Sequence, residues 1–168
     1  MLSEERVLEL LRYDPETGVF TWRVDRMSGQ GRKVQAKAGS VAGSADRLGY
    51  CCISIDRRIH KAHRLAFVFM TGSFPTTRCV DHVNGNPSDN RWANLREATP
   101  SQNQGNRRRS SCNSSGFKGV TKGRYKWHSG IRVRSKNYHL GSFDTPEEAH
   151  EAYKKAAREM FGEFARTE

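Results

Sequence analysis

The residues best suited to chemistry lie in the centre of the chain, where acid, imidazole and amide side chains follow one another closely. Asp81 and His82 are adjacent, and Asn94 and Asn103 come after them. Hydrolysis of a phosphodiester needs a base that takes a proton from water and a cation that stabilises charge on the phosphate. His82 is a suitable base near neutral pH. We therefore expect Asp81 and the Asn103 amide oxygen to bind Mg²⁺ or Mn²⁺, one ion per site, and Asn94 to hold the imidazole.

Each of these residues, taken alone, also fits a purely structural role. Asparagine and glycine favour tight turns and local hydrogen bonds, and the segment 78–106 is rich in both. His63 equally fits a structural histidine at a helix start or a catalytic residue. The order and spacing of the whole set favour the chemical interpretation.

The N-terminal part must supply the elements that position these residues. A capping serine and a run of apolar residues predict a helix over residues 3–12. Alternating apolar residues predict strands at 19–24 and 50–55, and an apolar segment at 62–70 predicts a helix. Residues 26–45 are rich in Gly, Ser, Ala and Lys, and indicate a mobile basic loop or a weak hairpin. Residues 80–86 predict a short strand that ends in a polar turn.

The C-terminal part has a regular pattern of its own. Three strands are predicted at 117–120, 126–133 and 137–143, followed by a helix that runs from the Thr145-Pro146 start to Phe161 and stops at Gly162. Apolar residues at helical spacing predict its buried stripe: Ala149, Ala152, Tyr153, Ala156, Ala157 and Met160. The fold class is therefore α+β, with a three-stranded antiparallel sheet packed on one helix in this part.

The charge indicates a polyanionic partner. The chain of 168 residues has a formal net charge of +11 and a sequence pI near 9.9, which favours nucleic acid or an anionic membrane. No acidic residue lies between Ala98 and Phe143. A solvated basic face is the plain alternative. The residues we expect to contact DNA are Arg107, Arg108, Arg109, Lys118, Lys122, Arg124, Lys126, Trp127, Arg132, Arg134 and Lys136.

Cysteine use and hydropathy bear on the compartment. The four cysteines form no C-x-x-C pair, so we expect free thiols and no structural zinc. No run of about 18 apolar residues is present to span a membrane. The N-terminus lacks the pattern of a secretory signal. We expect a protein of the cytoplasm, in a bacterial or phage-infected cell.

The central segment resembles the H-N-H endonucleases, closest to the phage-type homing and free-standing enzymes. The resemblance covers roughly residues 60–106. It implies a ββα-metal fold in which His82 is the general base, Asn94 orients it, and Asp81 and Asn103 bind the metal. Asn103 stands where many relatives have a third histidine, and His63 matches a recurring His-Arg. The matching residues, in order, are His63-Arg64-Leu65, Val80 to Asn86, Asp89-Asn90-Arg91, Asn94-Leu95-Arg96 and Gln102-Asn103.

The C-terminal segment resembles the Apetala-two/ethylene-response-factor (ERF) DNA-binding domain over residues 116–165. The matching run is Leu140-Gly141-Ser142-Phe143-Asp144-Thr145-Pro146-Glu147-Glu148-Ala149. The resemblance implies that Lys126, Trp127 and Arg132 contact DNA. The loop between the first two strands is shorter than in the plant proteins and lacks their first tryptophan.

Together these patterns predict a site-selective DNA endonuclease that binds double-stranded DNA as a monomer and nicks it. The expected organisation is a DNA-contacting region at 1–60, a nuclease domain at 60–106, a basic linker at 107–115 and an ERF-like domain at 116–168. Two rival functions stay open. One is a non-catalytic DNA-binding regulator with an inert nuclease centre. The other is an RNA-binding protein, although the clustered strand aromatics expected for base stacking are missing.

Overall fold

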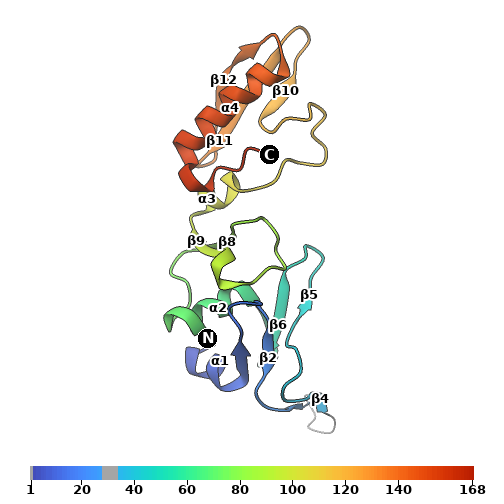
Figure 1. Cartoon of the computed structure of the whole chain (residues 1–168), viewed down its shortest axis with the longest axis vertical. Helices are drawn as coiled ribbons and strands as arrows, with labels where there is room; N and C mark the ends of the chain where they lie inside the picture. Colours follow the sequence, from blue (N-terminus) through green and yellow to red (C-terminus); the bar gives the residue numbers. More distant parts are fainter. Residues whose placement is uncertain (1, 28–33) are drawn as a thin grey trace. The chain divides into compact units, whose positions relative to one another are not determined.

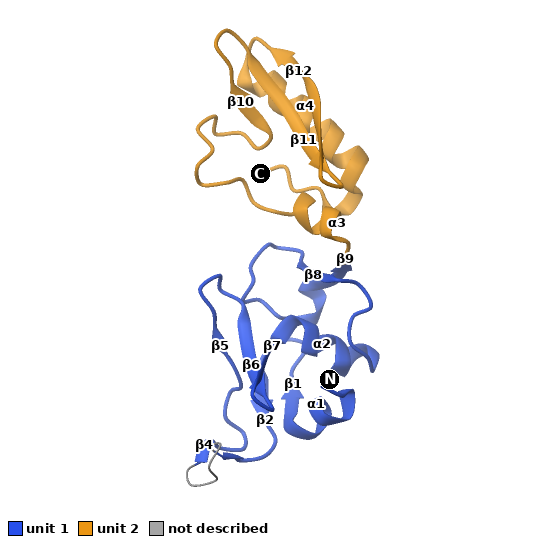
Figure 2. Cartoon of the chain, turned by 180° about the vertical axis from the view of Figure 1, so that it is seen from behind, with its two compact units in different colours: residues 1–97 blue, residues 98–168 orange. Residues whose placement is uncertain are grey.

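A computed structural model describes residues 2–27 and 34–168, which form two compact units (Figures 1 and 2). Unit 1 spans residues 1–97 and unit 2 spans residues 98–168. The division falls inside the segment that carries the expected nuclease motif, so Asp81, His82 and Asn94 lie in unit 1 and Asn103 lies in unit 2. We describe each unit by itself.

Unit 1 begins with a capped helix and a short hairpin. Helix α1 (Glu4–Leu10) starts where the Ser3 hydroxyl accepts a hydrogen bond from the Arg6 amide at 3.3 Å, as predicted. Strand β1 (Leu11–Tyr13) pairs antiparallel with β2 (Phe20–Trp22). Strands β3 (Arg26–Met27) and β4 (Val34–Ala36) form a second small pair. The loop or weak hairpin predicted at 26–45 is therefore short strands in part, and its residues 28–33 lie outside the described residues.

A three-stranded sheet and a helix form the centre of unit 1. Strands β5 (Ser44–Ala45), β6 (Cys51–Ile55) and β7 (Arg58–Lys61) pair in that order, and α2 (Ala62–Thr71) follows directly. The predicted helix and the strand β6 are confirmed, whereas β7 was not expected. The buried core joins these elements: Val7, Leu10, Leu11, Phe20, Trp22, Ala42, Ile53, Ile55, Ala62, Leu65, Ala66, Phe67, Val68, Val80 and Leu95. Burial of these side chains is the main favourable contribution to the unit's folding.

The segment that carries the expected motif follows α2. Strand β8 (Cys79–His82) pairs with β9 (Leu95–Ala98), and the short 3₁₀ helix η1 (Trp92–Asn94) precedes β9. Helix α3 (Pro100–Gly105) comes next along the chain and begins with a capping box between Thr99 and Gln102. Two strands and a helix thus occur in this order.

Unit 2 contains the predicted sheet and helix. Strands β10 (Val120–Lys122), β11 (Trp127–Val133) and β12 (Lys136–Phe143) form an antiparallel sheet, with a register shift at Ser129/Gly130. Helix α4 (Pro146–Phe161) packs against the sheet, and the 3₁₀ helix η2 (Gly162–Phe164) follows it (Figure 1).

Three details of unit 2 differ from expectation. The first strand starts at Val120 rather than Phe117. Met160 was predicted in the buried stripe of α4, but it is 43% exposed. Phe161 is buried in its place and contacts Gly105, which leaves no room there for a Cβ.

Within the described residues, no helix is both long enough and apolar enough to cross a membrane.

We predict that Gly119→Ala strongly destabilises unit 2. Gly119 has φ +76°, and a Cβ there would lie 2.0 Å from the Tyr153 ring. Overpacking and left-handed strain together should cost about 2–4 kcal/mol. Protection of the α4 amides against hydrogen exchange measures this loss.

Gly116→Ala is the matched control, because Gly116 has φ +80° but a Cβ there would meet no described atom within 4 Å. Its cost should be limited to the backbone term of about 1 kcal/mol. Equal loss of α4 protection in both variants would contradict the packing role of Gly119.

Candidate active site

Strand β8 carries a carboxylate and an imidazole on consecutive residues, and both are nearly removed from water. Asp81 is 3% exposed and His82 is 5% exposed. The two strands are joined just beyond β8, where the Val83 amide donates to the Asn94 carbonyl at 2.9 Å. Asp81 Oδ2 accepts from Arg96 Nε of β9 at 2.9 Å. This ion pair offsets the cost of burying the carboxylate.

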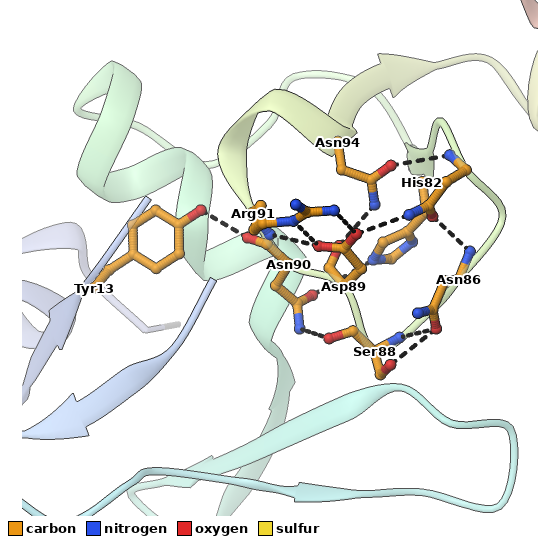
Figure 3. A network of polar contacts seen from close by, with 9 residues as sticks. Tyr13, His82, Asn86, Ser88, Asp89, Asn90, Arg91 and Asn94 are labelled. Atoms are coloured by element: carbon orange, nitrogen blue, oxygen red, sulfur yellow. Dashed lines mark hydrogen bonds and ion pairs between the residues drawn. The ribbon is translucent and has the colours of Figure 1, made fainter. Parts of the chain in front are cut away.

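The side-chain amide of Asn90 contacts the imidazole of His82 and helps to orient it. Asn90 Oδ1 lies 3.4 Å from His82 Nε2, and Asn90 Nδ2 donates to the Ser88 carbonyl at 3.2 Å. The Tyr13 hydroxyl donates to the Asn90 carbonyl at 2.7 Å, which ties this position to β1 (Figure 3). Because the Asn90 amide already donates through nitrogen, its oxygen faces the ring, and a hydrogen bond at this contact requires the imidazole proton to be on Nε2.

Asn94 acts on the loop between β8 and β9 rather than on the imidazole itself. Its Oδ1 accepts from the Asn84 amide at 2.9 Å, and its Nδ2 donates to the Asp89 carbonyl at 2.8 Å (Figure 3). The Asp89 carboxylate accepts from Arg91 at 2.6 and 2.8 Å and from Asn84 Nδ2 at 2.7 Å. These hydrogen bonds lower the pKa of Asp89, and the bonds from the Arg91 side chain have the largest effect. We expected Asn94 to hold His82 directly, and the structure gives that contact to Asn90.

Two further rings pack around His82. His63, in the first turn of α2, lies edge-on to His82 with 5.0 Å between ring centroids. The ring of Tyr50 lies 5.5 Å from His63 and 5.9 Å from His82. The sequence placed His63 in the site, and the structure brings it there. Tyr50 was missed, because nothing in a strand-forming run marks one tyrosine as part of a site.

Burial keeps both imidazoles neutral. Burial is the largest cause that lowers the pKa of His63 to about 3, and the nearby His82, Arg64 and Lys61 add to it. The pKa of His82 is also lowered, again chiefly by burial, while the Asn90 contact and the charges of Asp81 and Asp89 oppose that shift. A neutral imidazole is the form that accepts a proton.

Asn103, the other expected metal ligand, lies on α3 of unit 2 and is partly exposed. The backbone amide of Asn103 donates to the Thr99 carbonyl at 3.0 Å, within the first turn of the helix. Its placement relative to Asp81 is not determined by the structure.

Most of the residues expected to contact DNA are exposed on unit 2, and Lys118 and Trp127 are the partly buried ones. Lys118 Nζ donates to three carbonyls, those of Gly105 at 2.9 Å, Arg107 at 2.5 Å and Arg166 at 2.8 Å. Burial lowers the pKa of Lys118 to about 8. The Lys118 ammonium therefore joins three segments of unit 2.

Comparison with known proteins gives the family of the central segment. Residues 60–104 match the model of a family described as HNH endonuclease. An uncharacterised HNH endonuclease, L560 of Acanthamoeba polyphaga mimivirus, is 32% identical over 114 residues, which cover 67% of this chain and 59% of that protein. Protein 3.8 of Escherichia phage T7 is 34% identical over 97 residues, which cover 56% of this chain and 79% of that protein. No solved structure matches the chain.

We predict that His63 makes unit 1 less stable in acid. The pKa of His63 is about 3 in the folded state and about 6.5 in the unfolded state. Between pH 6.5 and about pH 3 only the unfolded chain takes up this proton. The contribution of neutral His63 to the free energy of unfolding is therefore fully present above pH 6.5 and is lost as the pH falls. One such proton contributes a slope of about 1.4 kcal/mol per pH unit.

The measurement is urea unfolding between pH 7 and pH 4.5 in a Trp127→Phe background, where the fluorescence comes from Trp22 and Trp92 of unit 1. His63→Gln should reduce the slope of unfolding free energy against pH by close to one proton. The reference is the same protein with His63 retained, since other histidines contribute to both slopes. An unchanged slope would show that His63 titrates normally in the folded protein.

Proposed function

This chain belongs to the HNH endonuclease family, and we propose that it is a divalent-metal-dependent, site-selective DNA endonuclease that hydrolyses phosphodiester bonds. The observation that carries the proposal is the buried pair on β8, where the neutral imidazole of His82 adjoins the carboxylate of Asp81. A protein that only binds DNA needs neither group in this arrangement.

In the proposed mechanism His82 takes the proton from the attacking water. With the Nε2 proton directed at Asn90 Oδ1, the basic atom is Nδ1. Asn90 is thus a positioning residue, held by Ser88 and Tyr13. Asn94 fixes the loop that carries Asn90, so its effect on the His82 ring is indirect.

The donor set fits a small divalent cation. Asp81 offers a carboxylate oxygen and Asn103 an amide oxygen, which are the hard ligands that Mg²⁺ and Mn²⁺ prefer. Such an ion, when bound, stabilises charge on the phosphate and on the leaving oxygen. Arg96 holds Asp81 Oδ2 at 2.9 Å and thereby orients the carboxylate. Asp81 and Asn103 are accordingly our proposed ligands.

Unit 2 is proposed to hold double-stranded DNA, as an ERF-like domain. The alternation of β11 puts Arg132 and His128 on the sheet face away from the buried Ser129 and Ile131. A sheet face of this kind can read a groove while the neighbouring cations contact phosphates. Lys126 forms an ion pair with Asp144 at 2.8 Å, which DNA would have to compete with. The similarity to a protein of phage T7 supports a phage or mobile-element origin, and we propose that the chain acts as a homing-type nuclease in an infected cell.

Plasmid cleavage tests the chemistry. We predict that His82→Ala lowers the rate of nicking by about 10²–10⁴-fold, the usual cost of losing a general base, and leaves the Kd for DNA within about twofold, since the ring is buried. Asp81→Asn should also lose activity, and chelation of the metal with EDTA should abolish it. Asp56→Asn is the control, because Asp56 is an exposed acid paired with Arg6. Full activity in EDTA, or in His82→Ala, would overturn the proposed function.

The products test the number of active centres. One Asp81–His82 pair serves one phosphate, so a monomer should convert supercoiled plasmid into open circle before linear DNA accumulates. With about six to eight phosphate contacts, log Kd should change with log salt with a slope of roughly 5 to 7. Linear product from the start, without an open-circle intermediate, would show two coordinated centres and hence a dimer.

A further inference from the structure

The turn between β5 and β6, residues Asp46 to Tyr50, holds an apolar side chain out into solvent. Leu48 is 75% exposed, and the neighbouring Arg47 is exposed too. Among the described residues, the Arg47 guanidinium makes no hydrogen bond or ion pair. A single exposed leucine needs no explanation by itself. This turn differs because hydrogen bonds fix its backbone and because it lies beside the candidate active site.

The turn is held by its own hydrogen bonds and by an ion pair. Asp46 Oδ1 accepts from the amides of Leu48 at 2.8 Å and Tyr50 at 3.0 Å. Backbone bonds join the Asp46 amide to the Tyr50 carbonyl at 2.9 Å and the Gly49 amide to the Asp46 carbonyl at 3.0 Å. Asp46 Oδ2 accepts from Lys61 Nζ at 2.5 Å. The backbone at the tip of such a turn has little freedom to move, which favours a preorganised contact.

The same turn adjoins the candidate active site. Its last residue, Tyr50, supplies the ring that lies 5.9 Å from His82. A Cβ on Gly49 would lie 3.1 Å from Pro87 Cγ, so the turn contacts the loop between β8 and β9. DNA bound with a phosphate at His82 would therefore pass close to Arg47 and Leu48.

We propose that the 46–50 turn is a DNA-contacting element, in which Leu48 lies against the bases next to the cleaved phosphodiester and Arg47 binds a neighbouring backbone phosphate. The inference rests on the proposed function. Apolar side chains such as leucine act as wedges between base steps when cations beside them hold the backbone. Deforming the duplex at this point would bring the scissile phosphate to His82, which is only 5% exposed.

The chain offers a matched control for Leu48. Ile59, on β7, is 74% exposed and pairs with Ser54, at the opposite end of the same sheet. The substitutions Leu48→Ser and Ile59→Ser therefore remove equally exposed apolar side chains from one sheet, near the site and away from it. Neither should disturb folding, since neither side chain is in the core.

The experiment compares these variants in the full-length protein with Mg²⁺. We expect Leu48→Ser to weaken DNA binding or slow single-turnover nicking by about ten- to hundredfold, the value of burying one leucine side chain. Ile59→Ser should stay within twofold of the wild type. Arg47→Gln should reduce the salt slope of binding by about one. Equal effects of Leu48→Ser and Ile59→Ser, or none, would overturn the proposal.

A second readout reports on the bases directly. After the nick site of the wild type has been mapped, 2-aminopurine is placed beside it and the duplex is bound by the His82→Ala protein. Fluorescence should rise as the base unstacks, and Leu48→Ser in the same background should remove the rise.

Failure of the inference is separable from failure of the proposed function. If the wild type nicks and Leu48→Ser nicks equally well, only the role of the turn is wrong. If the wild type nicks no DNA, the proposed function fails, and the Kd values of Leu48→Ser and Ile59→Ser for a plain duplex still decide whether the turn contacts DNA.

Discussion

The constraint on which unit 1 depends is the removal of Asp81 and His82 from water on one short strand. An ionised carboxylate is costly to bury unless it is paired and hydrogen-bonded. Arg96 supplies that pair from the adjoining strand β9, which requires β8 and β9 to keep their pairing across a loop of polar residues. The Asn94 amide and the Asp89–Arg91 ion pair hold that loop. The ion pair between the strands and the hydrogen bonds within the loop thus stabilise the same segment.

The same burial decides which groups can do chemistry. His63 and His82 lie 5.0 Å apart, and two imidazolium ions at that distance would repel each other in a medium that solvates them poorly. Both rings are therefore held neutral, and His82 is the one with a hydrogen-bonding amide at Nε2. The rings of Tyr50 and His63 pack beside the His82 ring. Orientation by Asn90, packing against the two rings and neutrality by burial together meet what the proposed role of His82 as a general base requires at neutral pH.

The sequence predicted the residues that carry local signals, and it missed those whose roles depend on distant neighbours. The helix starts at Ser3 and Thr145 follow from capping chemistry within one turn. Asp81 and His82 follow from their chemical types and their adjacency. The part played by Asn90 could not be deduced, because it depends on Tyr13, which lies 77 residues away. Strand β7 was missed because Arg58, His60 and Lys61 give it no apolar alternation.

Lys118 illustrates the limit of reading charge from sequence. It was grouped with the cations expected on DNA, yet its ammonium takes three carbonyls inside unit 2. A lysine is normally placed at the surface, and no local pattern marks the exception. The folded chain therefore presents a narrower set of free cations than the sequence suggests, and the bare composition overstates the phosphate-facing charge.

The two units use their charges for different purposes. In unit 1 the acids Asp46, Asp56, Asp81 and Asp89 are each paired with a lysine or arginine, and these four pairs neutralise part of its basic charge. From Ala98 to Phe143 unit 2 has no acid, and its arginines outside the Lys118 contact region lie exposed. Attraction of a polyanion scales with the cations that remain uncompensated. The acid-free segment of unit 2 should accordingly contribute strongly to affinity, whereas in unit 1 the Arg96–Asp81 and Arg91–Asp89 pairs fix the segment that carries His82.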